Sequence, residues 1–444
     1  MKIIIAGAGE VGSHLAKLLS REEQDIIVVD EDAAKLAVLD ANYNLMTVQG
    51  SPTSFKILKD VGVKYSDLFI AVTPYEDRNI TACSIASYMG ARRAVARIDN
   101  FELMQPEYKE YFANMGVKNV IYPEYLAAQE IVTALKRGWA RHWFELGNGE
   151  IILVGVKVRD HAEIVGKSMR ELTSQRHTLH VSAIRRGHQT IIPRGDDIIH
   201  SNDIVYITTT PEHIEEIREM CGKKQIDISL IMIMGCCFIA ARFAALAKKE
   251  WKIKIIERDL DRCRKLPELC PECEIIHGDG RDTDLLEDEG IQDCDAFLAL
   301  TGSAETNILA CLTAKEFSVA KTVAEVENVQ LIYQAENLNI GVIINKKLLA
   351  SGKIFQILLD ADAESSRFLA LPDAEVAEIV VKEGSKITKH PVKDLNLSRD
   401  LTLGGLVRDG HGMIVTGSTV FKPGDRVEVF CLSGHIHKIE KLFS

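Results

Sequence analysis

The chain has 444 residues, too many for one hydrophobic core, so we expect two to four domains. Its hydrophobic content of 46% and charged content of 26% are ordinary for a soluble globular protein. The formal net charge of −11 argues against a nucleic-acid partner, because such proteins need a basic face against the phosphates. Ten cysteines, and an N-terminal apolar run too short for a signal peptide, indicate the reducing cytoplasm.

The first part of the chain alternates short apolar runs with helical segments. Strands are predicted at 2–6, 25–30, 45–48, 68–72, 94–98 and 119–121, and the first two helices at 11–20 and 32–39. Such alternation with short turns predicts a parallel, doubly wound sheet of the Rossmann type.

The next segment has a different pattern. Strands are predicted at 151–158, 181–185 and 203–208, with turn signals at 186–187 and 194–196 and a closing helix at 213–220. This predicts a small α+β C-lobe of about 80 residues. The basic and aromatic run at 136–143 is expected to pack at a junction between domains or subunits.

The whole pattern occurs twice. A constant offset of 228 residues matches Gly7 with Gly235, Gly50 with Gly278, Asp67 with Asp295, Thr73 with Thr301 and Asn79 with Asn307. An internal duplication is therefore expected, with two Rossmann-like domains at 1–135 and 226–360, each followed by a small α+β C-lobe, at 136–222 and 368–444.

The first strand leads into a turn that fits G-x-G-x-x-G. Gly7 makes the tight turn, Gly9 lets the backbone approach a pyrophosphate, and Gly12 lets the helix pack close to the strand. Glu10 and Val11 lie within the same turn, where the free N–H groups of a helix start favour phosphate. The turn predicts a nucleotide site.

An acidic residue completes this predicted site. Asp30 ends the second predicted strand, 18 residues after Gly12, where a carboxylate accepts hydrogen bonds from the ribose hydroxyls of an adenosine. Glu31 and Asp32 follow it, and three acids together repel a 2′-phosphate. NAD or plain adenine nucleotides are therefore favoured over NADP.

Two further residues follow neighbouring strands. Thr73 comes after the fourth strand and is a candidate for contact with phosphate or ribose, whereas Arg97 ends the fifth and is a candidate for neutralising phosphate charge. The alternative for each is a surface or turn residue whose polar groups are already satisfied.

The second copy of the turn is altered. It keeps Gly235, but Cys237 replaces the glycine that approaches pyrophosphate and Ala240 the one that packs the helix. Glu257 still ends the following strand at the ribose position. We therefore expect a competent site in the first half and a weak or empty one in the second.

Two local patterns allow other interpretations. Residues 228–247 are almost all apolar and long enough to span a membrane, but the repeat favours a buried strand, a turn and a helix, and Arg242 makes a span costly. Cys263, Cys270, Cys273 and His277 have ligand types suited to zinc, but the matching region of the first half holds no cysteine. The favoured interpretation has neither span nor metal.

Taken together, the motifs resemble those of the Trk-type potassium uptake regulators. These motifs are the GAGEVG turn, Asp30, QGSPTS around Gly50, VTPYEDRN around Thr73, VARI ending at Arg97, and a small domain ending in VYITTTPEHI, all within a repeat covering the full chain. Members of that family consist of tandem KTN/RCK units, each a nucleotide-binding N-lobe followed by a C-lobe. Typical members keep a glycine-rich turn in the second half, from which this chain departs.

The resemblance implies a regulatory protein rather than an enzyme. It implies a cytoplasmic subunit on the inner face of the plasma membrane, which binds NAD(H) and also ATP or ADP, and gates a separate potassium-translocating membrane subunit. It further implies a homo-oligomer, a dimer or tetramer. The main alternative is a soluble NAD-dependent oxidoreductase, although no catalytic set emerges from the residues. A third interpretation is a structural ring protein with vestigial nucleotide sites.

Overall fold

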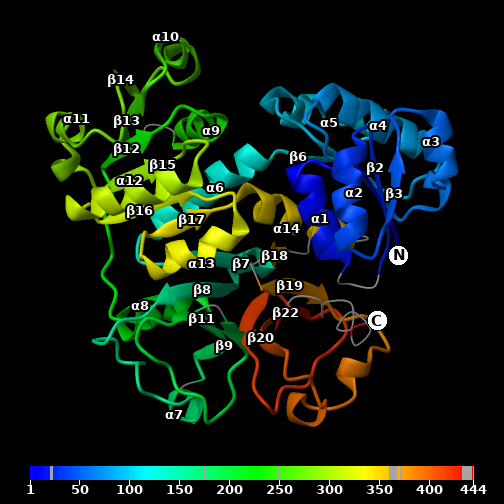
Figure 1. Cartoon of the computed structure of the whole chain (residues 1–444). Coiled ribbons are helices and arrows are strands. Elements are labelled where there is room, and N and C mark those ends of the chain that lie inside the picture. Colours follow the sequence, from blue (N-terminus) through cyan, green and yellow to red (C-terminus); the bar gives the residue numbers. More distant parts are fainter. Residues whose placement is uncertain are drawn as a thin grey trace. The chain divides into compact units, whose positions relative to one another are not determined.

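The computed structural model describes residues 1–20, 24–174, 177–187, 189–247, 250–359, 368–370, 373–432 and 443. It contains two Rossmann-like domains and two small domains that alternate along the chain, as the repeat predicts (Figure 1).

The first Rossmann domain is a parallel sheet of six strands in the order β3-β2-β1-β4-β5-β6. Its strands are β1 (Lys2–Ala6), β2 (Asp25–Asp30), β3 (Met46–Gln49), β4 (Leu68–Ala71), β5 (Ala94–Arg97) and β6 (Asn119–Ile121). Its helices are α1 (Glu10–Leu19), α2 (Ala33–Asn42), α3 (Phe55–Asp60), α4 (Glu76–Tyr88), α5 (Pro106–Asn114) and α6 (Pro123–Lys136). The strand order reverses between β1 and β4, which is where doubly wound sheets bind ligands.

Apolar runs fix the centre of this sheet. Ile3, Ile4 and Ile5 in β1 are fully buried, because helices cover both faces of a parallel sheet. The central strands β1 and β4 pair in parallel, with Ile3 opposite Leu68 and Ala6 opposite Ala71. Their carboxyl ends therefore lie side by side, and the loops that follow them meet at one edge.

The first small domain is an antiparallel sheet with the order β10-β9-β11-β8-β7. It comprises β7 (His142–Leu146), β8 (Ile151–Lys157), β9 (Leu179–Arg186), β10 (Gln189–Ile191), β11 (Ile204–Thr209), α7 (Met169–Ser174) and α8 (Ile214–Met220). The 136–143 run contributes to its core, where the rings of Trp139 and Trp143 pack edge to face with centroids 6.1 Å apart.

The second Rossmann domain repeats the first sheet strand for strand, in the order β14-β13-β12-β15-β16-β17. Its strands are β12 (Leu230–Met234), β13 (Lys252–Glu257), β14 (Glu274–His277), β15 (Ala296–Ala299), β16 (Lys321–Glu325) and β17 (Val342–Ile344). Its helices are α9 (Phe238–Ala247), α10 (Leu260–Leu269), α11 (Thr283–Asp288), α12 (Ala304–Glu316), α13 (Val329–Asn337) and α14 (Lys346–Leu359).

The second small domain repeats the first. Its sheet has the order β18-β19-β22-β20-β21, from β18 (Phe368–Ala370), β19 (Ala374–Val380), β20 (Leu401–Arg408), β21 (His411–Ile414) and β22 (Arg426–Leu432). One ion pair appears at matching places in both small domains. Arg186 binds both carboxylate oxygens of Asp203, and Arg408 binds both of Asp425. The duplication therefore extends to individual side-chain contacts.

The apolar segment at 228–247 is not a membrane span. It forms the central strand β12, a turn and the ten-residue helix α9, as the repeat predicts. Among the described residues, no helix combines the length and apolar character needed to cross a bilayer.

The last helix of each Rossmann domain belongs, wholly or in its larger part, to the compact unit that holds the other Rossmann domain. One unit holds residues 1–126 together with 347–364, and the other holds 127–346 together with 365–444. Helix α14 therefore packs with the first Rossmann domain, where Arg93 donates to the carbonyl of Ile357 at 2.5 Å, although it follows the second in the chain. The larger part of α6 belongs in return to the second unit.

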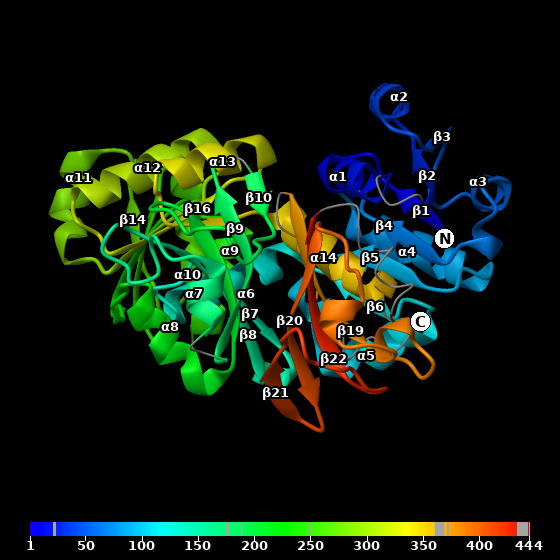
Figure 2. The same ribbon diagram turned by 90° about the horizontal axis from the view of Figure 1, so that it is seen from below.

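Within the larger unit, the sheets of the two small domains lie against each other (Figure 2). Tyr206 and Phe430 from the two domains share one buried apolar cluster, with ring centroids 5.6 Å apart. Glu428 is buried beside this cluster and accepts a hydrogen bond from Thr208 at 2.8 Å. Burial raises the pKa of Glu428 to about 7.

A buried ion pair joins the first small domain to the second Rossmann domain. Glu336 on α13 meets Arg185 on β9 with Oε–Nη distances of 3.1 and 3.2 Å, and both side chains are less than a tenth exposed. The guanidinium of Arg185 also lies 4.6 Å from the ring centre of Tyr333. Burial raises the pKa of Glu336 because desolvation disfavours its charged form.

We expect the substitution Glu336→Ala to lower the free energy of unfolding by about 3–5 kcal/mol, because it leaves a buried guanidinium without its counter-charge. The matched control is Glu163→Ala, which breaks an exposed pair with Lys167 and should cost less than about 0.5 kcal/mol. The urea midpoint of each variant measures the effect. Equal shifts for the two variants would contradict this assignment.

Candidate functional site

The three glycines of the turn in the first half have different surroundings. Two of them are in close contact with backbone atoms, and the third faces open space. Gly7 has a φ of +114°, and a Cβ there would lie 3.0 Å from the backbone N of Thr73. A Cβ on Gly12 would lie 1.8 Å from the carbonyl oxygen of Gly7. A Cβ on Gly9 would meet nothing within 4 Å. Packing within the chain therefore does not require a glycine at position 9, and the space beside it is open to a ligand.

Asp30 holds this turn in place. One of its carboxylate oxygens accepts from Ala8 N at 2.5 Å and the other from Asp32 N at 2.8 Å. A carboxylate has about four lone-pair positions, so each oxygen keeps capacity for a ribose hydroxyl. Asp30 is half-buried at the end of β2, where the sequence predicts it.

The two acids that follow Asp30 have separate contacts. Asp32 caps α2 by accepting from the backbone N of Ala34 and Lys35, which lowers its pKa. Glu31 pairs with Arg78 at 2.9 Å. The negative charge expected beside the ribose is therefore carried by Asp30, by Asp32 and by a Glu31 that Arg78 partly compensates.

Glu10 and Val11 lie in the first turn of α1. Helix α1 begins at Glu10, after Gly9, with no side-chain cap, so its first N–H groups are available to an anion. The carboxylate of Glu10 is exposed and pairs with Lys347 of α14 at 3.0 Å, and Val11 is half-buried. Helix α14 thus brings the positive charge of Lys347 to the glycine turn.

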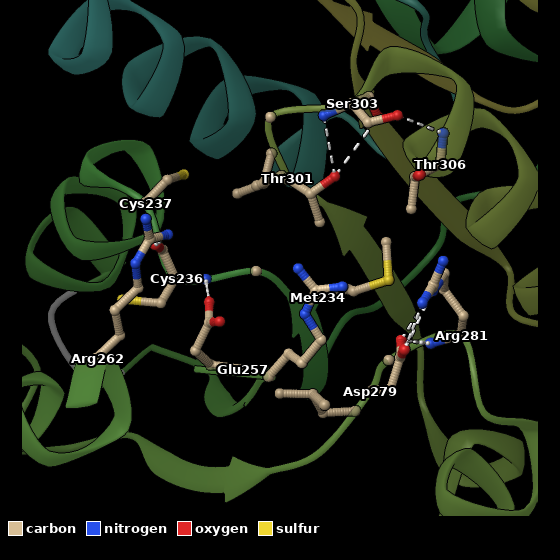
Figure 3. Close-up of a pocket in the computed structure, with 16 residues that line it drawn as sticks. Met234, Cys236, Cys237, Glu257, Arg262, Asp279, Arg281, Thr301, Ser303 and Thr306 are labelled. Carbon is tan, nitrogen blue, oxygen red and sulfur yellow. Dashed lines mark hydrogen bonds and ion pairs between the residues drawn. The ribbon is translucent and has the colours of Figure 1, made fainter. Parts of the chain in front are cut away.

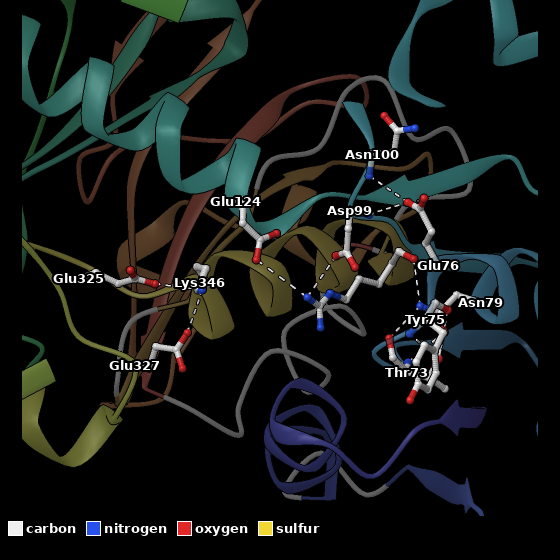
Figure 4. A network of polar contacts seen from close by, with 11 residues as sticks. Thr73, Tyr75, Glu76, Asn79, Asp99, Asn100, Glu124, Glu325, Glu327 and Lys346 are labelled. Carbon is white, nitrogen blue, oxygen red and sulfur yellow. Dashed lines mark hydrogen bonds and ion pairs between the residues drawn. The ribbon is translucent and has the colours of Figure 1, made fainter. Parts of the chain in front are cut away.

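Thr73 is held by a residue that sequence reasoning assigned no role. Asn79 Oδ1 accepts from Thr73 N at 2.9 Å and from Thr73 Oγ1 at 2.7 Å (Figure 4). Asn79 Nδ2 donates to the carbonyls of Thr73 and Arg97, both at 3.0 Å. Because the single hydroxyl proton of Thr73 is used within this network, Thr73 can offer a ligand only acceptor lone pairs.

The second half repeats this network. Asn307 accepts from Thr301 N and Oγ1 and donates to the carbonyls of Thr301 and Glu325. The signal in the sequence was the match of Asn79 with Asn307 in the repeat register. A buried asparagine that joins the ends of two adjacent strands is thus part of the framework of both halves.

Arg97 lies at the end of β5, as predicted, but its charge is already paired. Its guanidinium lies 3.2 Å from Asp99 and 3.9 Å from Glu124 on α6. In the second half Glu325 occupies the position that matches Arg97, and it pairs with Lys346 at the start of α14 (Figure 4). Two carboxylates already compensate the guanidinium of Arg97, which weakens the phosphate role for this residue.

Glu76 is another contributor that the sequence did not single out. Its carboxylate accepts from the backbone N of Asp99 and of Asn100, both at 2.9 Å (Figure 4). This contact fixes the chain leaving β5 against the start of α4.

The second half has a cavity of about 380 Å³ at the carboxyl ends of its strands (Figure 3). Glu257 is buried there and copies Asp30, accepting from Cys236 N at 2.7 Å and from Asp259 N at 2.8 Å. The lining includes Cys236, Cys237, Glu257, Arg258, Arg262, Asp279, Arg281, Thr301 and Ser303. Arg262 and Arg281 lie on opposite sides of Glu257 (Figure 3).

The four residues considered for zinc are used differently. Cys263 Sγ donates to the carbonyl of Glu257, and His277 Nε2 contacts the carbonyl of Arg258 at 3.1 Å. Cys270 and Cys273 interact with each other, which raises the pKa of Cys270 and lowers that of Cys273. Throughout the described ranges, no group of three or more His, Cys, Asp or Glu side chains is arranged to hold a metal ion.

A second cavity of about 600 Å³ lies where the two small domains meet. His180 lines it and shares a hydrogen bond of 2.9 Å with Thr402. Burial, with Arg194 nearby, lowers the pKa of His180 to about 4, so the imidazole is neutral at physiological pH. His188 lies outside the described residues.

Comparison with known families agrees with the observed repeat. The model described as the TrkA-N domain matches residues 3–123 and 231–346, and that of the TrkA-C domain matches 153–222 and 376–444. The Trk system potassium uptake protein TrkA of Halomonas elongata is 30% identical, with 100% of this chain and 98% of that protein aligned. TrkA homolog 1 of Methanosarcina mazei is 28% identical, with 100% of both aligned.

Solved structures share the fold over the whole length. The crystal structure of the GsuK RCK domain has a TM-score of 0.61 at 15% identity and covers 100% of this chain and 94% of that one. The structure of the GsuK channel bound to NAD has a TM-score of 0.62 at 15% identity, with 100% and 78% covered. At this identity the likeness shows a common fold.

The turn geometry predicts losses of stability of different size for alanine substitutions at two of its glycines. Gly12→Ala should lower the free energy of unfolding by about 1–3 kcal/mol, since its Cβ overlaps the Gly7 carbonyl. Gly9→Ala should cost less than about 1 kcal/mol, the usual size of a change at a helix cap. Thermal unfolding of both variants checks this, and a larger loss for Gly9→Ala would refute the assignment.

Proposed function

Because this chain belongs to the TrkA family of Trk potassium uptake proteins, as its two TrkA-N and two TrkA-C matches show, we propose that it is a cytoplasmic regulatory subunit. In this proposal it binds NAD(H) in its first Rossmann domain and controls a separate potassium-translocating membrane subunit. It acts from the inner face of the plasma membrane, as a homo-oligomer of two or four copies, and catalyses no reaction.

The observation that carries the proposal is the empty space beside Gly9, next to the half-buried carboxylate of Asp30. The glycine turn supplies backbone N–H groups for the pyrophosphate, and Asp30 supplies acceptors for the adenosine ribose. Glu31 beside Asp30 disfavours a 2′-phosphate, so NAD(H) and the plain nucleotides ATP and ADP are preferred to NADP. The GsuK channel, solved with NAD, supports the choice of ligand class.

The pairing of Glu10 with Lys347 gives a physical route from ligand to response. A pyrophosphate at the turn repels the Glu10 carboxylate and attracts the Lys347 ammonium 3.0 Å from it. Lys347 is on α14, the helix that the second half of the chain contributes to the first unit. Binding would therefore change how strongly α14 is held, and the regulator responds only if its two states bind nucleotide with different affinity.

We expect calorimetric titration of the full chain with NADH to give saturable binding near one site per chain. Asp30→Ala should weaken it about tenfold or more, because the ribose loses a charged acceptor, whereas Glu163→Ala, on an exposed pair elsewhere, should leave it unchanged. NADP should compete with NADH for this first site more weakly than NAD does.

Absorbance at 340 nm during the same titration distinguishes the rival function. Turnover of NADH would move the assignment to an oxidoreductase, and the absence of binding by NADH, NAD, ATP and ADP alike would leave a structural scaffold. For the regulatory role, the chain should alter potassium uptake by its membrane partner in cells, and Gly9→Ala should abolish the response to nucleotide while the protein remains folded.

A further inference from the structure

We propose that the cavity of the second Rossmann domain takes a different ligand class from the first: an adenine nucleotide that carries a phosphate on its ribose. This rests on the proposed function, because it takes the second half to be a nucleotide site as well. The cavity of about 380 Å³ is within the size range of small-molecule sites.

The first argument is a reversal of charge at matching positions. Arg258 follows Glu257 as Glu31 follows Asp30, so an arginine occupies the place that is acidic in the first half. Arg258 is exposed and lines the cavity, and its charge adds to that of Arg281 in lowering the pKa of Asp279. An arginine close to the ribose is the group that accommodates a 2′-phosphate in dinucleotide-binding folds.

Two more arginines surround the same space. Arg262 lies near the turn, with its guanidinium 3.5 Å from the carbonyl of Cys236. Arg281 binds Asp279 with a shortest N–O distance of 2.6 Å, which lowers the pKa of Asp279 to about 2. The lining thus has three arginines against the carboxylates of Glu257 and Asp279, so its charge is positive.

The altered turn of the second half favours the same ligand class, because it lacks the second glycine of the motif. A Cβ at Gly9 would extend into open space in the first half, and Cys237 places a side chain at the matching position in the second. Pyrophosphate therefore loses the close backbone approach that it needs. Phosphate recognition moves from the turn to the arginines, whose planar guanidinium groups bind phosphate in pairs of hydrogen bonds.

Glu257 still favours a ribose beside these arginines. Its two oxygens accept from Cys236 N and Asp259 N, as those of Asp30 accept from Ala8 N and Asp32 N. It therefore keeps lone pairs for the ribose hydroxyl that is not phosphorylated. The phosphate itself, on the 2′ or the 3′ oxygen, is assigned to Arg258.

The test compares three isomers of equal charge, 2′-AMP, 3′-AMP and 5′-AMP, by calorimetry on the full chain. We expect one of the first two to bind about tenfold or more tightly than 5′-AMP. Arg258→Glu, which copies Glu31 of the first half, should abolish this preference and leave NADH binding unchanged. Arg258→Lys should restore part of it, and equal melting temperatures confirm that the variants are folded.

Two outcomes separate this inference from the proposed function. If the three isomers bind equally or not at all while NADH binds, the second-site proposal is overturned and the first-site function stands. If a ribose phosphate binds in an Arg258-dependent way while NADH does not, the second site stands and the NAD(H) function falls. Preference that survives Arg258→Glu also overturns the assignment to this cavity.

Discussion

The carboxylate of Asp30 accepts the backbone N–H groups of Ala8 and Asp32, and the rest of the first site depends on this contact. It holds the glycine turn against the end of β2, so that the turn faces the point where the strand order reverses. Buried or half-buried backbone donors need such a partner, because an unsatisfied N–H costs about 1–3 kcal/mol. The same contact leaves lone pairs on both oxygens of Asp30, and the proposed function uses them to bind a ribose. Glu257 makes the equivalent pair of contacts in the second half, which explains why this position stays acidic although the turn beside it has changed.

Comparison of the two halves distinguishes contacts that both halves keep, which support the fold, from residues that differ between them. The strand order, the Asn79 and Asn307 networks and the arginine–aspartate pairs of the small domains are kept in both halves. The differences between the halves include two at the cavity, where Cys237 replaces Gly9 and Arg258 replaces Glu31.

Most of the fold was predictable from the sequence because buried parallel strands are continuous apolar runs. The predicted bounds of β1, β2 and β6 agree with the structure, and those of β4 and β5 differ by one residue. The edge strand β7 was not predicted, because its alternation of aromatic and polar residues is short and follows a basic run; Trp143 in that strand packs in a domain core. The exchange of α6 and α14 was not predictable either, since helical periodicity shows which face is buried and not which sheet covers it.

The candidate site was predictable in part. Gly7, Gly9, Gly12 and Asp30 follow from motif and spacing, and the structure brings them together at one end of the sheet. The pairing of Glu10 with Lys347 was not predictable, because it joins residues from the two halves of the chain. The separate contacts of Glu31 and of Arg97 also depend on tertiary packing, and no local pattern encodes them.

A crystal structure of the full chain grown with NADH would test the central claim most directly. The account predicts one NADH per chain, with its pyrophosphate at the turn of Gly7, Gly9 and Gly12 and its adenosine ribose on Asp30, and no NADH in the cavity beside Cys237. NADH in both halves, or in the second half alone, would contradict it.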